Sequence, residues 1–348
     1  MRGCFLALLM LFAVSCNTNT DTSTSIPHTV NRSFYHWKQS FKMEALDTEH
    51  MTTLGLKTFY VRFFDIVWQP PAGAVPTAII DFESKVIPSL SLIPCIYIEN
   101  KVFQQVQAND KVEELAKKSV AKIRSLLKKS GKAAIAEIQL DCDWTKSTQL
   151  AYFHFLESFK KEWKDEVILS ATIRLHQIKY AKKTGVPPVD KGMLMYYNIG
   201  KIKDLNTPNS ILDNQIGRQY ISPKTDYELP LDMALPIFEW GVWFRGGKFA
   251  GIFNDLNSSK LKEMGDFKHL EKDVFMLEQD TVAGNRYLRS GDIIRLEGIS
   301  AKALKEAVKV CRKAVNTEAL NVSFYHWDKD LIEGQGLEFL EEVYRSFE

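Results

Sequence analysis

Polar and apolar side chains alternate along residues 137–144, in the order Glu-Ile-Gln-Leu-Asp-Cys-Asp-Trp. Successive side chains of a β-strand point to opposite faces, so one face of this run is polar and acidic while the other is apolar. The run 167–176 repeats the pattern. The two polar faces carry Glu137, Gln139, Asp141, Asp143, Ser170, Thr172, Arg174 and His176. Helix-like segments follow both runs, which favours a closed barrel with a polar interior and outward faces packed under helices.

Strand-like and helix-like segments continue to alternate along the rest of the chain. Apolar residues at period two predict eight strands, at 33–37, 58–67, 92–99, 135–143, 167–176, 192–198, 233–240 and 321–327. Apolar residues at period 3.6 predict helices at 43–54, 111–129, 147–163, 209–220, 301–315 and 336–347. This succession predicts an α/β fold, a (β/α)8 TIM-type barrel over residues 33–348.

Two features stand out against the regular alternation. Between the seventh and eighth strands, residues 246–298 contain further strand-like runs at 275–277 and 292–297, which predict a small β insertion. The pentapeptide Ser-Phe-Tyr-His-Trp occurs at 33–37 and again at 323–327, in the first and last predicted strands. Those strands become neighbours when a barrel closes, so we interpret the two copies as two strands that solve one local packing and binding problem.

Side chains at the carboxyl ends of parallel strands meet at one mouth of a barrel, where the following loops build the active site. Nearly every predicted strand ends in an acidic, aromatic or other polar group. Burying such groups unpaired costs about 1–3 kcal/mol each, so a purely structural barrel has little reason to gather them. The strand-end residues are Tyr35, His36, Trp37, Arg62, Asp65, Tyr97, Glu99, Asp141, Asp143, Arg174, His176, Tyr197, Asn198, Glu239, Trp240, His326, Trp327 and Asp328.

Acids interleaved with aromatic rings are typical of carbohydrate sites, where rings stack on sugar faces and carboxylates or amides bind hydroxyls. Cleavage of a glycosidic bond needs two carboxyl groups, one to protonate the leaving oxygen and one to act on the anomeric carbon or on water. We predict Asp143 and Glu239 as this pair. The residues expected to support them are Asp141, Arg174, His176 and Glu99, and those expected to bind sugar are Trp37, Tyr197, Asn198, Trp240 and Trp327.

The arrangement resembles that of (β/α)8 glycoside hydrolases whose acid/base ends the fourth strand and whose nucleophile ends the seventh. The resemblance implies these roles for Asp143 and Glu239, although the fourth strand of those enzymes usually ends in Asn-Glu and this one ends in Cys-Asp. The same run is similar to the DxxDxDxE motif of chitinase-like enzymes, with Asp141 and Asp143 as its last two aspartates. Ile138 and Thr145 stand at the first aspartate and the terminal glutamate, so the acid of that family is missing.

A further resemblance is to a group of exported bacterial barrel lipoproteins. It is carried by Ile-Arg-Leu-His-Gln at 173–177 and Pro-Pro-Val-Asp at 187–190. This likeness implies no particular activity. The second function that the sequence leaves open is therefore a non-catalytic glycan-binding or scaffold lipoprotein on the same barrel.

The candidate residues also have structural interpretations. Across a strand spacing of about 4.8 Å, Asp141 and Asp143 would meet Arg174 and His176 and neutralise these cations. The phase of the run 233–240 places Glu239 on an apolar face unless the strand bulges. Tryptophans at strand ends are often core residues. Arg62 and Asp65 are expected to form an internal ion pair, a structural role.

Metal chemistry is the rival enzyme class, since Glu99, Asp141, Asp143 and His176 have oxygen and nitrogen atoms suited to a metal ion. The sequence contains neither a His-x-His strand motif nor HExxH, so we expect no metal. It also contains no GxSxG motif and no glycine-rich phosphate or GxGxxG loop, and we expect no cofactor.

The amino-terminal residues are typical of an export signal. Arg2 precedes an apolar run, 4–14, that is too short for a stable membrane helix, so residues 1–15 are predicted to be a signal peptide. Phe-Ala-Val-Ser-Cys at 12–16 resembles the lipobox of bacterial lipoproteins, which implies lipidation of Cys16. Residues 16–32 are predicted to be a flexible tether after the lipidated cysteine. We expect an exported, membrane-anchored protein of the cell envelope, periplasmic or on the cell surface; the alternative is a plain cleaved signal peptide.

Charge and cysteine content bear on other classes of partner. Removing the leader deletes only Arg2 from 45 basic and 43 acidic residues, so the net charge falls from +2 to +1 and nucleic-acid binding gains no support. Once Cys4 and Cys16 are set aside, the remaining cysteines are too few for a disulfide framework and lack metal-binding spacing. These are Cys95, Cys142 and Cys311.

Overall fold

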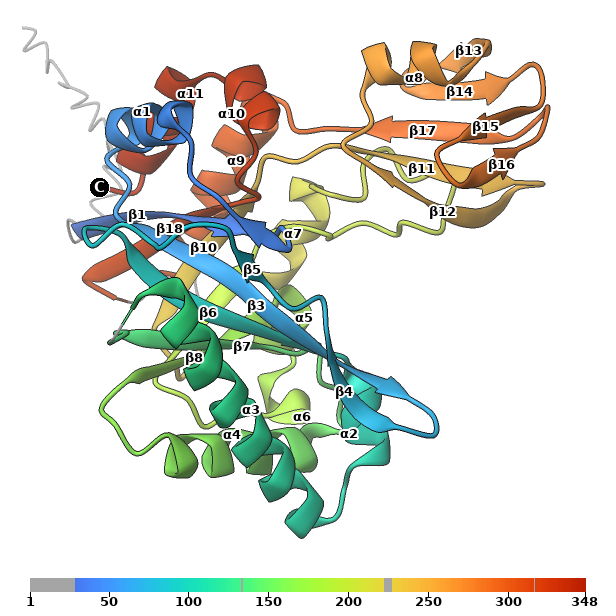
Figure 1. Ribbon diagram of the computed structural model, residues 1–348. Helices are drawn as coiled ribbons and strands as arrows, with labels where there is room; N and C mark the ends of the chain where they lie inside the picture. Colours follow the sequence, from blue (N-terminus) through green and yellow to red (C-terminus); the bar gives the residue numbers. More distant parts are fainter. Residues whose placement is uncertain (1–28, 133, 222–226, 316) are drawn as a thin grey trace, which may run out of the picture.

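Eight parallel strands form a closed barrel at the centre of the molecule (Figure 1). The computed structural model describes residues 29–132, 134–221, 227–315 and 317–348. β1 pairs with β18 on one side and with β3 on the other, which closes the ring. The predicted (β/α)8 barrel is confirmed. Its strands are β1 (Thr29–His36), β3 (Thr58–Gln69), β6 (Ser91–Ile98), β7 (Glu137–Asp141), β8 (Ile168–Arg174), β9 (Lys191–Met195), β10 (Leu231–Pro236) and β18 (Ala319–Tyr325).

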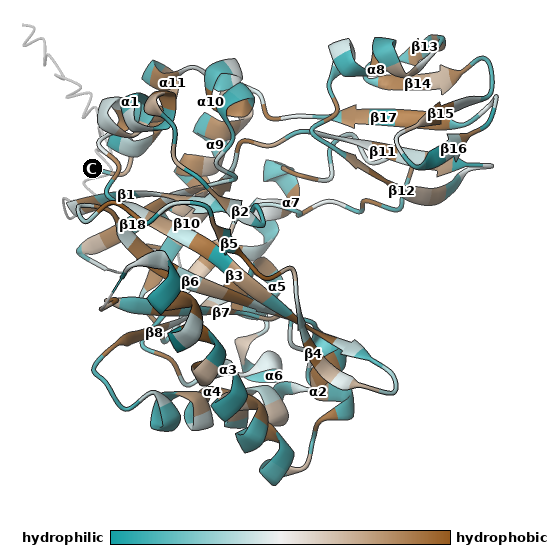
Figure 2. Cartoon of the chain, in the orientation of Figure 1, coloured by the Kyte–Doolittle hydropathy of each residue, from teal (hydrophilic) through white to brown (hydrophobic). Residues whose placement is uncertain are grey.

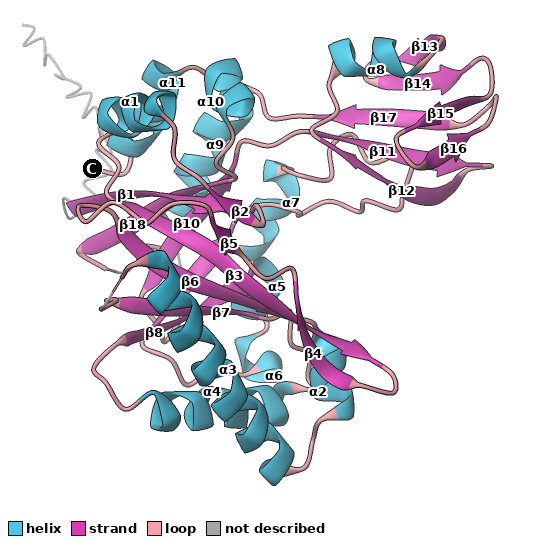
Figure 3. Ribbon diagram, viewed as in Figure 1, coloured by secondary structure: helices cyan, strands magenta, loops and turns pink. Residues whose placement is uncertain are grey.

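Helices surround the barrel, as Figure 3 shows. They are α1 (Ala45–Leu54), α2 (Asn100–Gln105), α3 (Asn109–Ser130), α4 (Gln149–Trp163), α5 (Leu175–Lys179), α6 (Ala181–Thr184), α7 (Asn214–Tyr220), α9 (Ala301–Cys311), α10 (Lys329–Gln335) and α11 (Leu337–Arg345). β3 is followed not by a helix but by the antiparallel strand β4 (Gly73–Thr77), which pairs with the end of β3. A short pair, β2 (Ser40–Phe41) with β5 (Asp81–Phe82), lies nearby. In Figure 2 the barrel strands are mostly brown, and the outward side of α3 is teal.

Several predicted strands extend too far at their carboxyl ends. The runs 135–143, 167–176, 192–198 and 233–240 end as strands at residues 141, 174, 195 and 236. Alternating side chains continue past these points, but the backbone no longer pairs with the neighbouring strand. Asp143, His176, Tyr197, Asn198 and Glu239 therefore lie in the loops or helices that follow the strands.

The first strand begins earlier than predicted. Residues 29–32, which the sequence assigns to the tether, belong to β1 and pair in register with residues 319–322 of β18. Backbone pairing orders this segment although it has little apolar content. The rest of the tether, the signal peptide and Cys16 lie outside the described residues. Within the described ranges, no helix combines the length and the apolar character that a membrane span requires.

The insertion between β10 and β18 is a five-stranded antiparallel sheet in the order β12-β11-β17-β14-β13. The insertion begins at Trp240, six residues before the predicted boundary at 246, because Trp240 starts a new strand and does not end the seventh barrel strand. In Figure 1 it extends to the upper right of the barrel. Its elements are β11 (Trp240–Arg245), β12 (Lys248–Asn254), α8 (Ser258–Met264), β13 (Phe267–Glu271), β14 (Val274–Leu277), β15 (Thr281–Ala283), β16 (Arg286–Leu288) and β17 (Ile293–Glu297).

A buried ion pair joins the insertion to the loop that follows β9. Arg295 donates to Glu297 at 2.7 Å and to the backbone oxygen of Asp204 at 2.6 Å. Glu297 also accepts hydrogen bonds from the Ser210 hydroxyl at 2.6 Å and the Trp240 indole at 2.8 Å. The insertion is thus held at a fixed position on the barrel, and Trp240 is held with it.

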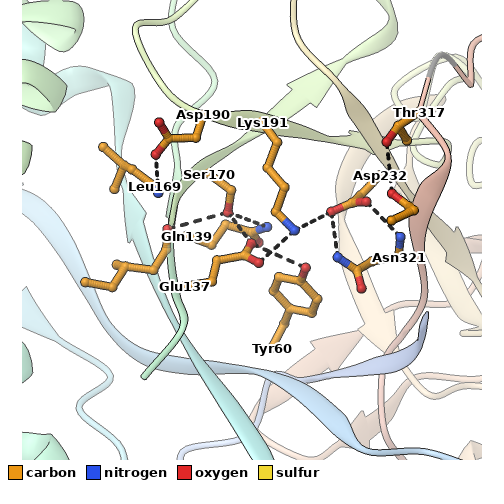
Figure 4. A network of polar contacts seen from close by, with 12 residues as sticks. Tyr60, Glu137, Gln139, Leu169, Ser170, Asp190, Lys191, Asp232, Thr317 and Asn321 are labelled. Atoms are coloured by element: carbon orange, nitrogen blue, oxygen red, sulfur yellow. Dashed lines mark hydrogen bonds and ion pairs between the residues drawn. The ribbon is translucent and has the colours of Figure 1, made fainter. Parts of the chain in front are cut away.

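The interior of the barrel is polar on the face that the sequence indicates. Figure 4 shows the Lys191 ammonium between the carboxylates of Glu137 and Asp232, 2.7 Å from each. The Ser170 hydroxyl donates to Glu137 at 2.6 Å, and Tyr60 lies against the same carboxylate. Burial raises the pKa of Glu137, and Lys191 opposes that effect. One ammonium therefore compensates two carboxylates that would otherwise be buried without a cation.

Replacing Lys191 by Met is expected to lower the free energy of unfolding by about 3 kcal/mol, because it leaves two buried carboxylates without a cation. Chemical denaturation at neutral pH measures this loss. The loss should shrink as the pH is lowered and Glu137 takes up a proton more readily than in the unfolded chain.

Lys160→Met is the matched control. Lys160 pairs with Asp190 at 2.6 Å, but the two side chains are 50% and 40% exposed. Water screens such a pair, so the expected loss is below about 1 kcal/mol. Equal losses in the two variants would show that the buried ammonium has no special role.

Candidate active site

A cavity of about 580 Å³ opens at the carboxyl ends of the barrel strands. Each of the eight strands, or the residues that follow it, contributes at least one side chain, and the insertion adds three more. The volume lies within the usual range of small-molecule sites. The lining residues are Tyr35, Trp37, Lys38, Arg62, Asp65, Tyr97, Asp141, Asp143, Thr172, Arg174, Met195, Tyr197, Asn198, Phe238, Glu239, Trp240, Asn254, Asp255, Tyr325 and His326.

Two aspartates at the end of β7 differ in environment. Asp141 is the last strand residue and accepts a hydrogen bond from the Thr172 hydroxyl at 2.5 Å. Burial, and then the charge of Asp143, raise the pKa of Asp141 to about 7. The Asp143 side chain is 57% exposed and lies 3.7 Å from Nε of Arg174. The cavity thus holds one carboxyl that keeps its proton up to near-neutral pH, beside a carboxylate that faces a cation.

Glu239 also reaches the cavity. β10 ends at Pro236, so the strand alternation that would have turned Glu239 toward apolar neighbours stops before it. The side chain is half-buried and accepts a hydrogen bond from Asn257 Nδ2 at 2.9 Å. In barrel order β7 and β10 are separated by β8 and β9, so Glu239 approaches the cavity from a different side than the two aspartates.

A second ion pair lies on the barrel wall. Arg62 Nε donates to Asp65 at 2.7 Å, as the sequence predicts for an internal pair. The Arg62 guanidinium also lies over the Trp37 ring, 5.6 Å from its centroid. Asp65 is therefore occupied by Arg62, and Trp37 is held at the edge of the cavity.

Aromatic rings form much of the remaining surface. Tyr197 stacks on Tyr325 with ring centroids 5.4 Å apart, and Phe238 packs edge-on against both rings. Of the residues predicted to bind sugar, four line the cavity, namely Trp37, Tyr197, Asn198 and Trp240. This surface combines flat rings with carboxylates and amides, the two kinds of group that a sugar ring contacts.

Trp327 is not part of this cavity. It is buried, packs edge-on against Phe34 and Phe59, and donates its indole N–H to Asp47 at 2.9 Å. The prediction that Trp327 binds sugar in the mouth is therefore wrong. Its side chain points to the outer side of the barrel wall, because the chain changes course between Tyr325 and Trp327.

His176 and Glu99 also lie outside the cavity. His176 belongs to α5, is exposed, and borders a separate small hollow with Tyr220. Glu99 precedes α2 and accepts a hydrogen bond from the backbone N–H of Trp68 at 3.0 Å. Both residues follow the end of their strand, where the chain has already turned away from the mouth. Neither residue lines the cavity with Asp143 and Glu239, so their predicted support of the catalytic pair stays a prediction.

The four residues named for a metal do not converge. Asp141 and Asp143 line the cavity, but Glu99 and His176 do not. Among the residues that the structure describes, no group of three or more His, Cys, Asp or Glu side chains is arranged to hold a metal ion. Cys95, Cys142 and Cys311 are buried free thiols.

Three polar lining residues had no signal in the sequence. Lys38 follows β1, Asn254 ends β12 of the insertion, and Asp255 follows it. The backbone N–H of Asp255 donates to the backbone oxygen of Glu239 at 3.0 Å, which joins the two residues through their backbones. Strand patterns cannot reveal this contact, because it joins the insertion to the segment that follows β10.

No known family model matches the chain, and a search of curated proteins finds no match. Several solved structures are similar to this chain. One is the spore cortex-lytic enzyme SleL of Bacillus cereus, which is 12% identical; the alignment covers 92% of this chain and 74% of SleL, with a TM-score of 0.49. A chitinase of Rhizomucor miehei is 12% identical; the alignment covers 90% of this chain and 99% of the chitinase, with a TM-score of 0.48. A chitinase of Chromobacterium violaceum is 10% identical; the alignment covers 91% of this chain and 98% of the chitinase, with a TM-score of 0.45. These similarities leave the chemistry of this chain to the residues of its own cavity.

The raised pKa of Asp141 predicts a pH dependence of stability. Its ordinary value is 3.8 and its folded value is about 7, so between these limits the folded protein binds more protons than the unfolded chain. The free energy of unfolding should therefore fall as the pH rises from about 4 to about 7. Asp141→Asn should remove that slope, which urea denaturation across this pH range measures.

Asp143→Asn provides the control for the cause of the shift. It removes one of the charges that raise the pKa of Asp141, so the slope should persist but end at a lower pH. A wild-type stability that is independent of pH in this range would contradict the assignment of the proton to Asp141.

Proposed function

We propose that the protein is a glycoside-hydrolase-like barrel that binds a carbohydrate in its mouth and cleaves a glycosidic bond by acid/base chemistry between carboxyl groups. One observation carries the proposal: Asp141, Asp143 and Glu239 line one cavity together with Trp37, Tyr197 and Trp240. Acids placed on different sides of a cavity walled by aromatic rings suit a bond between two sugar rings.

The roles follow from the environments of the carboxyl groups. Cleavage requires a proton on the leaving oxygen as the bond to the anomeric carbon breaks, and a second carboxylate that acts on that carbon or takes a proton from water. Asp143 and Glu239 are the proposed pair. The pKa of Asp141 is raised to about 7, and Asp141 lies beside Asp143. Its proposed role is therefore to supply a proton to Asp143.

The second candidate function is non-catalytic glycan binding. Arg174 Nε lies 3.7 Å from Asp143, and this partly exposed ion pair needs no catalytic role to explain it. Thr145 stands at the position where chitinase-like enzymes carry their acid, and its hydroxyl lies 3.0 Å from the Ser147 hydroxyl. A cavity that binds glycans without cleaving them would account for both observations.

Hydrolysis assays on a glycan panel separate the two functions. The panel includes chitin and cellulose oligosaccharides, peptidoglycan fragments, β-1,3-glucans and mannans. Asp143→Asn and Glu239→Gln should each lower kcat by about 10²–10⁴-fold while leaving binding within a few-fold, since each removes one proton-transferring group. Reducing-sugar release measures cleavage, and calorimetry measures binding.

Glu114→Gln, which changes an exposed acid on α3, is the control and should keep full activity. Full hydrolysis by both catalytic-pair variants would overturn the assigned roles. Binding by the wild type without cleavage of any panel member would establish the non-catalytic function. A wild type that binds no glycan would overturn both candidates.

We also propose that the barrel is exported and anchored to a membrane of the cell envelope through a lipid on Cys16. The support is the sequence pattern of residues 1–16, an apolar leader that ends in a lipobox-like cysteine.

Cys16→Ser should abolish labelling by a fatty-acid analogue and move the protein from the detergent phase to the aqueous phase. Two-phase detergent partition of cell extracts measures the change. Cys95→Ser, which changes a buried barrel thiol, is the control and should remain in the detergent phase. Wild-type protein in the aqueous phase would contradict the anchor.

A further inference from the structure

A second cavity, of about 380 Å³, lies beside the mouth. Its walls come from the loops that follow β1 and β18, from the start of α1 and from the β2–β5 pair. Lys38 lines this cavity and the mouth cavity alike, so the two meet at that residue. The lining residues are His36, Lys38, Ser40, Lys42, Glu44, Asp47, Glu83, Trp327, Asp328, Lys329 and Asp330.

The repeated Ser-Phe-Tyr-His-Trp segments form the wall between the two cavities. β1 and β18 pair so that the first three residues of one copy lie opposite the same three residues of the other. From the first copy, Tyr35 and Trp37 line the mouth and His36 lines the second cavity. From the second copy, Tyr325 and His326 line the mouth and Trp327 lines the second cavity. The repeat therefore gives both cavities aromatic and imidazole side chains.

His36 supplies a buried polar atom to the second cavity. Its side chain is 3% exposed and packs against Phe41, with ring centroids 4.9 Å apart. Nδ1 of His36 has no hydrogen-bond partner among the residues that the structure describes. A buried polar atom without a partner is unfavourable, so a ligand hydroxyl that bonds to this imidazole would be stabilised.

The charged groups of the second cavity alternate in sign. Lys38 pairs with Asp328 at 2.7 Å, Lys42 lies 3.5 Å from Glu44, and the Ser40 hydroxyl donates to Glu83. Each lysine already faces a carboxylate, and the five carboxylates of the lining outnumber its three lysines, so the cavity offers more hydrogen-bond acceptors than donors and disfavours an anion. Hydroxyl groups donate to carboxylates and also accept from ammonium groups, so a hydroxyl-rich ligand matches this lining.

We propose that the second cavity is an additional subsite for the same glycan chain whose other sugar units occupy the mouth, so that the protein binds oligosaccharides extending past Lys38. This inference rests on the proposed function, because it extends the carbohydrate site. The Lys38–Asp328 pair lies at the junction, and the Lys38 side chain is 49% exposed. Such a pair is weak in water and can open to let a sugar chain pass.

Chain-length dependence of binding tests the inference. Disaccharides and hexasaccharides of the chitin and cellulose series are titrated against the full protein in the cold, with surface plasmon resonance as the readout. The wild type should bind the hexasaccharide about tenfold more tightly than the disaccharide of the same series, because the longer chain fills both cavities. Ser40→Trp, which fills the second cavity, should abolish that gain and leave disaccharide affinity within about twofold.

Lys42→Ala is a second variant for the case that a tryptophan disturbs the β2–β5 pair. Lys42 is exposed and lines only the second cavity, so its loss should weaken hexasaccharide binding alone. Lys111→Ala, on the exposed surface of α3, is the matched control and should change neither affinity.

Equal wild-type affinity for short and long chains would overturn the inference while leaving the proposed function intact. Equal weakening of both lengths by Ser40→Trp and by Lys42→Ala would do the same. Absence of binding by every member of both series at both lengths, together with a negative glycan panel, would overturn the proposed function and the inference with it.

Discussion

The pairing of β1 with both β18 and β3 is the constraint on which the rest of the structure depends. These contacts join the first and the last strand of the barrel and close the sheet into a ring. In an open sheet, β7 and β10 would carry their acids to separate places along one edge. In the closed ring their carboxyl ends border a common mouth, so Asp141, Asp143 and Glu239 line one cavity.

Burial divides the charges of the barrel interior into two layers with different properties. Lower in the barrel, Lys191 lies between Glu137 and Asp232, and this layer is compensated by direct contact. At the mouth, the cation Arg174 faces Asp143, whereas Asp141 accepts its hydrogen bond from a hydroxyl. Burial beside Asp143 raises the pKa of Asp141, which is the kind of shift that acid/base chemistry uses.

Segments outside the eight strands decide the shape of the site. The insertion contributes Trp240, Asn254 and Asp255 to the mouth, and its Glu297 holds the Trp240 indole through a hydrogen bond. The loops after β1 and β18 enclose the second cavity, which shares Lys38 with the mouth. A barrel with the same strands but other loops would keep its interior and lose both of these surfaces, which is why one fold supports many chemistries.

The sequence alone determined the barrel, because the alternation at 137–144 and 167–176 reports which face of each strand is buried, and strand order follows from chain order in a parallel barrel. It also placed Asp143, Glu239 and Trp240 near the mouth, since they follow strand ends. Tertiary structure alone decided that Trp327 packs in the barrel wall and that His176 and Glu99 do not line the mouth. It also decided that the backbone of Asp255 bonds to the backbone of Glu239. These outcomes depend on where backbone pairing stops and on contacts between distant segments. A periodic pattern of side chains records neither of them, because it reflects burial along one strand at a time.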